Sequence, residues 1–360
     1  MPRPILQQTL LLYLTKNKNK VILLLLNNKG ITMKKFFSLL LTLLCFSFCF
    51  VGCGQTNTIN VYMPDGAPAL AMAEILNTNE QFNNKVDYNV VPANEISNYI
   101  LQETADIAIL PSNVASKICG SGKKYQAVGI CTFGNLYLIG NKQITSLSEL
   151  KGETIGCIQV QNVPGLTLQH ILQKNNISYT LNYNEQSENN VYIKGIEGTD
   201  VVALFKANSL NFALVAEPLC TTALNRLNAN NVEKLFDIQE LYGTNGYPQS
   251  LLVMKKSFIQ NNPTFVQNFI TKMQNNKTWT NSNADKCVNA IQPYLKQGQT
   301  ASFTANNFNA QVLQNCNIGF MLACENKTFI TDYLTNLSSI NANSVGNINS
   351  EFWFEYEQQN

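Results

Sequence analysis

Residues 58–63 read TINVYM and residues 105–110 read ADIAIL, two largely apolar segments that predict buried strands. Between them the pattern predicts a helix over 67–76, a strand over 86–91 and a second helix over 94–102. This order of strand, helix, strand, helix and strand indicates a parallel sheet with right-handed crossovers. The sequence therefore predicts an α/β fold.

A second unit of similar make-up follows a long extended run at 125–141, which is interrupted at Gly134 and Asn135. Strands are predicted there over 154–159, 179–183 and 211–216, and helices over 147–151, 164–174, 200–207 and 219–227. Another extended segment is predicted over 247–254. It leads into a carboxyl-terminal tail that is predicted to be helical over 263–279, 284–295, 304–314 and 327–337.

The amino-terminal region predicts export. Met33-Lys34-Lys35 forms a charged start, an apolar run follows over 36–51, and Gly52 precedes Cys53. A charged start, an apolar middle and a small residue before the cleavage point define a secretory signal peptide, here 33–52. The apolar run is short for a membrane span. Residues 1–32 contain only shorter apolar stretches interrupted by lysines, and we interpret them as a mis-assigned upstream segment.

Cys53 makes the predicted signal more specific. The stretch Phe50-Val51-Gly52-Cys53 resembles a bacterial lipobox, with Phe where Leu is commonest. The resemblance implies that the thiol of Cys53 receives a lipid and that residues 53–57 form a lipidated linker. The protein would then be anchored to the cell membrane on its extracytoplasmic face. An ordinary secreted protein and a single-span anchor are the alternatives.

Composition excludes two classes of protein. With 45% hydrophobic and 13% charged residues among 360, the chain is suited to folding and not to disorder. Residues 1–52 carry seven Lys or Arg and no acid, so the rest holds 18 Lys or Arg against 23 Asp or Glu. Binding to nucleic acid needs clustered cations, and residues 53–360 contain a single arginine, Arg226. We therefore expect no nucleic-acid partner.

The side chains needed for common catalytic and metal sites are scarce. His170 is the only histidine, no paired-carboxylate motif occurs, and nucleotide-binding glycine motifs are missing from the sequence. Seven cysteines follow Cys53, an odd number without a CxxC, which gives no support to a zinc site or a disulfide framework. Cys316 and Cys324 either form a disulfide or remain buried thiols. We expect no enzyme activity, no metal and no cofactor.

Five short stretches resemble one family in their order and spacing. They are PDGAPAL (64–70), ADIAILP (105–111), GNL (134–136), SELKG (148–152) and AEP (216–218). These stretches are similar to those of the nitrate/sulfonate/taurine and thiamine-precursor group of ABC-transporter substrate-binding proteins. The resemblance implies the type II periplasmic-binding-protein fold, in which two hinge crossings join two lobes. It places the first crossing at 125–141 and the second crossing at 247–254. It places lobe 1 at 57–136 plus 247–360 and lobe 2 at 137–246.

The same resemblance implies a function. A binding lipoprotein of this group captures a small organic solute or anion between its lobes and delivers it to the permease and ATPase of an ABC importer. Its partners would be the small-molecule ligand, the transporter and, through acylated Cys53, the lipid bilayer; we expect a monomer. An enzyme on the same fold and a sensory lipoprotein without a transporter are the alternatives.

Candidate ligand-binding residues follow from the expected sheet. In open α/β sheets, ligands bind beyond the carboxyl ends of strands, where loops lead into helix N-termini with unpaired N–H groups. The loops that meet this description contain Asp65, Gly66 and Ala67, then Pro111, Ser112 and Asn113, and then Gln161, Asn162 and Gly165. Each of these loops is alternatively a plain turn. Gly66 and Gly165 would let a ligand approach the backbone closely.

Further candidates lie at the crossings and after a later strand. Thr132, Phe133, Gly134 and Asn135 belong to the first crossing, and the ring and the amide would face the ligand. Tyr247 begins the second crossing and either stacks on a planar ligand or packs inside the protein. Glu217 either accepts from a ligand amine or caps the following helix.

The scarcity of arginine limits the solute. A dicarboxylate usually attracts a bidentate arginine, and Arg226 is expected on a helix outside the cleft. A monoanion held by helix N-termini fits better, as does a neutral or cationic aromatic solute held by Phe133, Tyr247 and Glu217. A sulfonate and a pyrimidine-type thiamine precursor both remain open.

Overall fold

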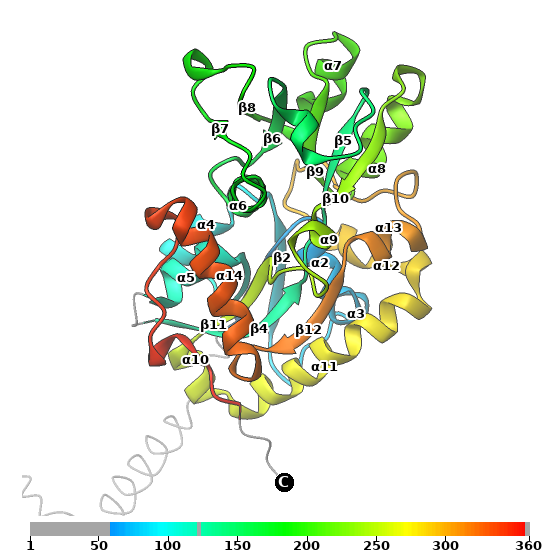
Figure 1. Ribbon diagram of the computed structural model, residues 1–360. Coiled ribbons are helices and arrows are strands. Elements are labelled where there is room, and N and C mark those ends of the chain that lie inside the picture. Colours follow the sequence, from blue (N-terminus) through cyan, green and yellow to red (C-terminus); the bar gives the residue numbers. More distant parts are fainter. Residues whose placement is uncertain (1–57, 121–123, 357–360) are drawn as a thin grey trace, which may run out of the picture. The chain divides into compact units, whose positions relative to one another are not determined.

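The structure is a computed structural model that describes residues 58–120 and 124–356. The chain divides into the units Met1–Gln55 and Thr56–Asn360, and all described elements belong to the second unit. The predictions made for the signal peptide, for Cys53 and for the linker lie outside the described residues. The fold shown in Figure 1 is that of the second unit by itself.

Six strands form the first sheet, in the order β12-β4-β11-β3-β1-β2. Their bounds are β1 Ile59–Pro64, β2 Val86–Val91, β3 Ile107–Pro111, β4 Tyr125–Thr132, β11 Ser250–Lys255 and β12 Ile318–Leu322. β1 lies between β2 and β3 and is parallel to both, as the sequence predicted. β11 is antiparallel to β3 and β4, and β12 is antiparallel to β4 at the sheet edge.

The second sheet has the order β10-β5-β9-β6-β8-β7. Its strands are β5 Leu136–Gly140, β6 Thr154–Ile158, β7 Tyr179–Thr180, β8 Val191–Ile196, β9 Phe212–Ala216 and β10 Glu233–Asp237. β6 is parallel to β8 and β9, whereas β5 is antiparallel to β9 and β10. In each sheet the parallel strands thus form one side, as far as the edge strand β2 or β7, and the antiparallel pairs form the other side.

Two apolar clusters cover the two faces of the first sheet. One contains Val61 and Ile109 with helices α2 Ala67–Leu70, α3 Ala73–Thr78, α11 Pro263–Ser282, α12 Ala284–Ile291 and α13 Ala310–Asn315. The other contains Ala108 and Leu110 with helices α4 Ile96–Leu101, α5 Ser112–Gly120 and α14 Lys327–Ile340. Figure 1 shows α11 in yellow beside β12, which it contacts. Neighbours Ala108 and Ile109 lie on opposite faces because side chains alternate along a strand.

The second sheet is covered in the same way. α6 Val163–Lys174 and α9 Ile238–Tyr242 pack with Leu138 on one face. α7 Val201–Lys206 and α8 Leu219–Arg226 pack with Ile139 on the other. The remaining helix, α10 Lys256–Asn261, follows β11 directly.

Helix α14 contributes to the cores of both sheets. Ile330 and Leu334 belong to the first-sheet cluster, whereas Tyr333 and Leu337 belong to the second-sheet cluster. The Tyr333 hydroxyl lies 2.8 Å from Thr167 Oγ1 on α6, and both groups are buried. The tail therefore packs against both sheets and does not lie on one alone.

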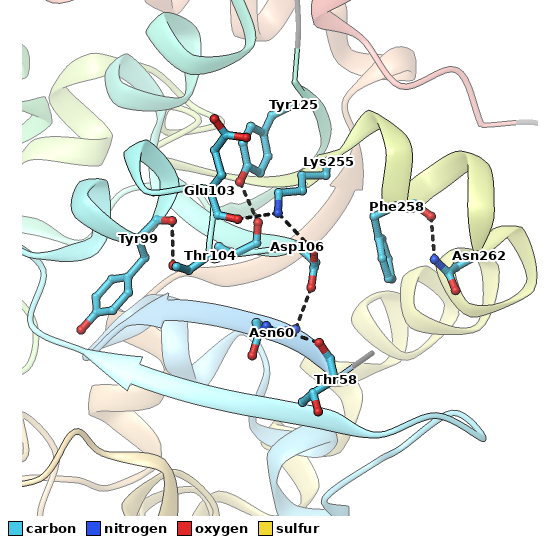
Figure 2. Close-up of polar contacts among 11 residues, drawn as sticks. Thr58, Asn60, Tyr99, Glu103, Thr104, Asp106, Tyr125, Lys255, Phe258 and Asn262 are labelled. Carbon is cyan, nitrogen blue, oxygen red and sulfur yellow. Dashed lines mark hydrogen bonds and ion pairs between the residues drawn. The ribbon is translucent and has the colours of Figure 1, made fainter. Parts of the chain in front are cut away.

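Polar contacts connect four strands at one end of the first sheet (Figure 2). This is the end opposite the predicted loops at 65–67 and 111–113. Asp106 Oδ2 accepts a hydrogen bond from Asn60 N at 3.0 Å, and Asp106 Oδ1 lies 3.3 Å from Lys255 Nζ. The Tyr125 hydroxyl donates to the Ala105 carbonyl at 2.6 Å. These contacts join β1, β3, β4 and β11.

Several predicted elements need correction. The helix predicted over 67–76 is interrupted at Ala71 and Met72, because Asn276 of α11 accepts from Glu74 N and donates to Leu70 O, each at 2.9 Å. A continuous helix would pair those two backbone groups with each other. The predicted helix over 304–314 is reduced to α13. The predicted strand over 179–183 is reduced to β7.

Three strands were missed altogether: β8, β10 and β12. β12 lies in the tail that was predicted to be helical, at residues IGFML. It forms there because the edge of β4 offers unpaired backbone groups for an antiparallel partner.

Candidate functional site

Two predicted loops, one from each sheet, meet at the carboxyl ends of their strands. Asn113 follows β3 in the first sheet, and Asn162 follows β6 in the second. Asn113 Nδ2 donates to Asn162 Oδ1 at 3.4 Å. The predicted loops at 111–113 and 161–165 are therefore brought together, and they define the candidate site.

Asp65, at the end of β1, is used to hold a neighbouring segment. Its carboxylate accepts from Gly66 N at 2.8 Å, from Gln299 Nε2 at 3.1 Å and from Ser302 N at 2.7 Å. Gly66 has a φ of +106°, and a side chain there would meet open space. Ala67 is buried at the start of α2. Asp65 thus fixes residues 299–302 beside the β1 loop.

Residues 111–113, where β3 leads directly into α5, are bound to the second crossing. Ser112 N donates to the Gln249 carbonyl at 3.0 Å, and the Ser112 hydroxyl donates to the Pro248 carbonyl. Pro111 is paired with Ser250 in the β3–β11 ladder. Asn113 is only 2% exposed, and its Oδ1 has no hydrogen-bond partner among the described residues.

The first crossing connects to both the second crossing and the loop after β9. Thr132 Oγ1 lies 2.7 Å from Ser250 Oγ. Asn135 Nδ2 donates to the Glu217 carbonyl at 3.3 Å, and Asn135 Oδ1 accepts from Gln249 Nε2 at 2.7 Å. The buried amide of Asn135 and the half-buried amide of Gln249 thus connect the two crossings and the segment after β9.

Tyr247 is packed inside the protein, the second of the two alternatives. Its ring stacks on Tyr333 with centroids 5.2 Å apart, and its hydroxyl donates to Gln239 Oε1 at 3.2 Å. Complete burial raises its pKa well above the ordinary value. Gly134 gives room to this ring, since a Cβ there would lie 2.8 Å from it.

Glu217 caps the following helix, again the second alternative. Its carboxylate accepts from Thr221 N at 3.1 Å and from Thr221 Oγ1 at 2.9 Å. It also accepts from Asn315 Nδ2 of α13 at 3.1 Å. The side chain is buried and bound on both oxygens.

Gly165 leaves no space for a ligand beside the backbone, and Gln161 makes no hydrogen bond with the described residues of the first sheet. A Cβ at Gly165 would lie 2.0 Å from the Val160 carbonyl oxygen, so the protein's own backbone already fills that space. Gln161 is exposed, whereas Asn162 is half-buried. Of this loop, Asn162 makes the contact with the other sheet.

Phe133 lies away from the predicted loops. Its ring would be 3.0 Å from a Cβ at Gly319, which places it against β12. There it lines an open groove of about 1020 Å³ together with Tyr137, Lys277 and residues 243–246. None of the loops at 65–67, 111–113 and 161–165 lines this groove. We place the candidate site at the loops, because that is where the carboxyl ends of parallel strands from both sheets converge.

The sequence reasoning missed Gln249 and Gln299. Gln249 is bound to Asn135, and Gln299 is bound to Asp65. Each also has a buried Oε1 that accepts no hydrogen bond from the described residues. Their positions, before β11 and in an irregular part of the tail, carry no motif that would have identified them.

Other reactive groups do not gather at the site. His170 lies on α6 beside Tyr242, and burial together with Lys174 lowers its pKa. All seven cysteines of the described segments are free thiols, Cys316 and Cys324 included. The described segments contain no group of His, Cys, Asp or Glu suited to a metal ion. Across residues 58–120 and 124–356, no helix is long and apolar enough to cross a bilayer.

Comparison with known proteins gives the family and the fold. The family model described as NMT1/THI5 like matches residues 85–284. No curated protein matches the chain. The family expected from the five sequence stretches is confirmed by this match.

Several solved structures resemble most of this chain. An ABC transporter structure from Parabacteroides distasonis has a TM-score of 0.68 and 18% identity, covering 83% of this chain and 99% of that one. The periplasmic aliphatic sulphonate binding protein SsuA from Escherichia coli has a TM-score of 0.61 and 13% identity, covering 84% and 95%.

The alkanesulfonate-binding protein SsuA from Xanthomonas axonopodis pv. citri, bound to MOPS, has a TM-score of 0.56 and 11% identity, covering 80% and 93%. At such identities the similarity establishes the fold alone. The predicted two-lobed α/β fold of type II periplasmic binding proteins is confirmed.

Proposed function

The chain belongs to the NMT1/THI5-like family, and on that basis we propose that it is the solute-binding component of an ABC importer. It captures a small organic solute or anion between two lobes and delivers it to the permease and ATPase. The main supporting observation is the hydrogen bond from Asn113 to Asn162. It brings together the carboxyl ends of strands from both sheets, where ligands of open α/β sheets bind.

The proposed lobes are residues 57–136 plus 247–360 and residues 137–246. The division of strands between the sheets supports this, since the first sheet uses 59–132 and 250–322 and the second uses 136–237. The segments 133–135 and 243–249 are the proposed hinges. Closure around the solute would change their backbone angles and leave each sheet intact.

We propose binding without catalysis. Glu217 is bound to Thr221 and Asn315 and acts as a helix cap, and His170 lies on α6 beside Tyr242. Two of the similar structures are described as sulfonate-binding proteins, and a third is described as an ABC transporter. The protein would act as a monomer and without a cofactor.

We also propose that Cys53 anchors the protein on the extracytoplasmic face of the cell membrane. Two or three acyl chains give stable anchoring at about 0.8 kcal/mol per buried CH₂, where a single chain is marginal. In a bacterial host, the full chain should partition into the membrane fraction and incorporate labelled palmitate. Cys53→Ser should lose the label, whereas Cys49→Ser should keep it. Equal labelling of both variants would refute the anchor.

A thermal-shift screen tests solute capture. The probes are sulfonates, nitrate, taurine, pyrimidines and amino acids. A solute at 100 times its Kd adds about 2.7 kcal/mol to stability, which raises the Tm by a few degrees for a protein of this size. A flat response to every probe from well-folded protein would count against the proposal.

Asn162 supplies a variant with a matched control. Asn162 and Asn262 are both N-cap residues, and neither side chain caps its helix. Asn262 donates to the Phe258 carbonyl at 3.0 Å (Figure 2). It follows α10, which begins at the end of β11 away from Pro111. Asn162→Leu should reduce the solute-induced shift, and Asn262→Leu should preserve it. An undiminished shift in Asn162→Leu would place the solute elsewhere.

A further inference from the structure

Three side-chain amides beside the candidate site each keep a buried oxygen that accepts no hydrogen bond. They are Asn113 Oδ1, Gln249 Oε1 and Gln299 Oε1. Within residues 58–120 and 124–356, only one other buried side-chain polar atom lacks a partner, Glu74 Oε2 on α3. All four atoms are oxygens. The described residues therefore contain buried hydrogen-bond acceptors without donors, and no buried side-chain donor without an acceptor.

The three amides lie on neighbouring segments. Asn113 is the second residue of α5, which directly follows β3, and the Gln249 carbonyl accepts from Ser112 N at 3.0 Å. Gln299 is bound to Asp65, which directly follows β1, and β1 is the parallel neighbour of β3. Each amide is therefore attached to a loop at the carboxyl edge of the first sheet.

The orientation of the Gln249 amide is fixed by its neighbours. A backbone carbonyl can only accept, so Asn135 must present its NH₂ to Glu217 O, at 3.3 Å. Asn135 then presents its oxygen to Gln249, which must donate through Nε2, at 2.7 Å. Turning the Gln249 amide would bring two oxygens together. Oε1 is thus the atom left without a donor.

The Gln299 amide is fixed by the same logic. Asp65 Oδ2 accepts from Ser302 N at 2.7 Å and from Gln299 Nε2 at 3.1 Å. An ionised carboxylate only accepts, so Gln299 must again present its NH₂, and Oε1 is left over. Asn113 Nδ2 donates to Asn162 Oδ1 at 3.4 Å, a bond between two amides in which no backbone group sets the orientation. In this orientation Asn113 Oδ1 accepts no hydrogen bond, in a side chain that is 2% exposed.

We infer that Asn113, Gln249 and Gln299 select a solute that donates N–H groups, such as an amine, an amide, an amidine or an aminated ring. A buried acceptor without a partner is costly, and a solute N–H would relieve that cost on binding. The oxygens of a sulfonate or nitrate only accept, and they would add further acceptors to the site. This inference rests on the proposed function and narrows its solute class.

Calorimetric titration of the full chain with isosteric pairs tests the inference. The pairs are taurine and 1-propanesulfonate, β-alanine and butyrate, and 4-aminopyrimidine and 4-methylpyrimidine. Each pair exchanges an amine or amino group for a methyl group. Sites built to bind an N–H reject the analogue that lacks it, so the donor member should bind at least about tenfold more tightly.

Two variants test whether Asn113 causes the preference for the solute that donates an N–H group. Asn113→Leu removes one acceptor and should reduce the ratio within the best-binding pair by about tenfold. Glu74→Gln changes the residue that holds the fourth unpaired oxygen, on α3 and bound to Lys272 at 3.0 Å. It should leave the ratio unchanged. A ratio that is unchanged in a folded Asn113→Leu protein would overturn the assignment to Asn113.

The outcomes separate this inference from the proposed function. Equal binding within the pairs, or tighter binding of the methyl members, would overturn the inference and leave solute capture intact. Equal binding is the result expected if water satisfies the three oxygens in the bound state. Failure of all six probes, together with a flat thermal-shift screen, would count against solute capture itself, and the inference would fall with it.

Discussion

Single amide side chains connect segments that lie far apart in this sequence. Asn113, Asn135 and Asn276 are all at most 3% exposed. Asn135 connects the first crossing to the β9 loop, and Asn276 connects α11 to the break between α2 and α3. An amide both donates and accepts, so one residue can satisfy two buried backbone groups without burying a charge.

Alanine substitutions at Gly134 and Gly298, compared with each other, separate the cost of steric overlap from the cost of backbone strain. It has a φ of +97°, and a Cβ would lie 2.6 Å from Gln239 and 2.8 Å from the Tyr247 ring. Gly298 has a φ of +82° with nothing near its Cβ position. Gly298→Ala should cost about 1 kcal/mol from the left-handed backbone, and Gly134→Ala about 1–3 kcal/mol more from overpacking. Urea unfolding measures both, and equal costs would show that the contact at Gly134 is unimportant.

His170 should make stability depend on pH. Burial, followed by the charge of Lys174, lowers its pKa below the ordinary value of 6.5. The unfolded chain then binds the proton more tightly, so His170 favours the folded state above about pH 6.5 and loses that effect as the pH falls toward its folded pKa.

The Tm of wild type and of His170→Gln should be compared at pH 7.5 and pH 5. The Tm of wild type minus that of the variant should be larger at pH 7.5. A difference that is the same at both pH values would contradict the lowered pKa.

At the scale of secondary-structure elements, Asn276 determines the break between α2 and α3. Asn276→Leu should remove two buried hydrogen bonds and destabilise the protein by about 2–4 kcal/mol. The adjacent Asn275 is exposed on the same helix, and Asn275→Leu should cost less than about 0.5 kcal/mol. Thermal and urea unfolding compare the two variants. Similar stability of both would mean that a continuous helix replaces the break at no cost.

Local sequence predicted the elements whose own side chains determine them. The strand predicted over 86–91 has the bounds of β2, and the helix predicted over 164–174 differs from α6 by one residue. β12 was missed because its pairing partner, β4, lies nearly two hundred residues earlier in the sequence. The break at Ala71 was missed for the same reason, since the amide of Asn276 causes it.

The candidate site was predictable to a similar extent. Strand ends and helix starts identified the loops of Asp65, Asn113 and Asn162. The long-range partners Gln249 and Gln299 have no local signal, because their roles depend on Asn135 and Asp65. Glu217 and Tyr247 had two alternatives in the sequence. The bonds of Glu217 to Thr221 and Asn315 and the packing of Tyr247 on Tyr333 decided between them.

At the scale of the whole folded unit, the helical tail contacts both sheets. Tyr333 of α14 binds Thr167 of α6, and Asn307 Nδ2 donates to Thr222 Oγ1 at 3.0 Å near the start of α8. Any change in the angle between the sheets must therefore be accommodated in the tail as well as at the proposed hinges. These two tail contacts are polar, and one of them involves the buried ring of Tyr333. So few contacts are compatible with a reversible closure of the lobes.

Small-angle X-ray scattering with and without a saturating solute tests solute capture between the lobes most directly. The solute is the strongest stabiliser from the thermal-shift screen. Capture between the lobes predicts a smaller radius of gyration in the bound state, and Asn162→Leu should show a weaker response at the same solute concentration. A solute that binds at saturation and leaves the scattering curve unchanged would contradict capture between the lobes.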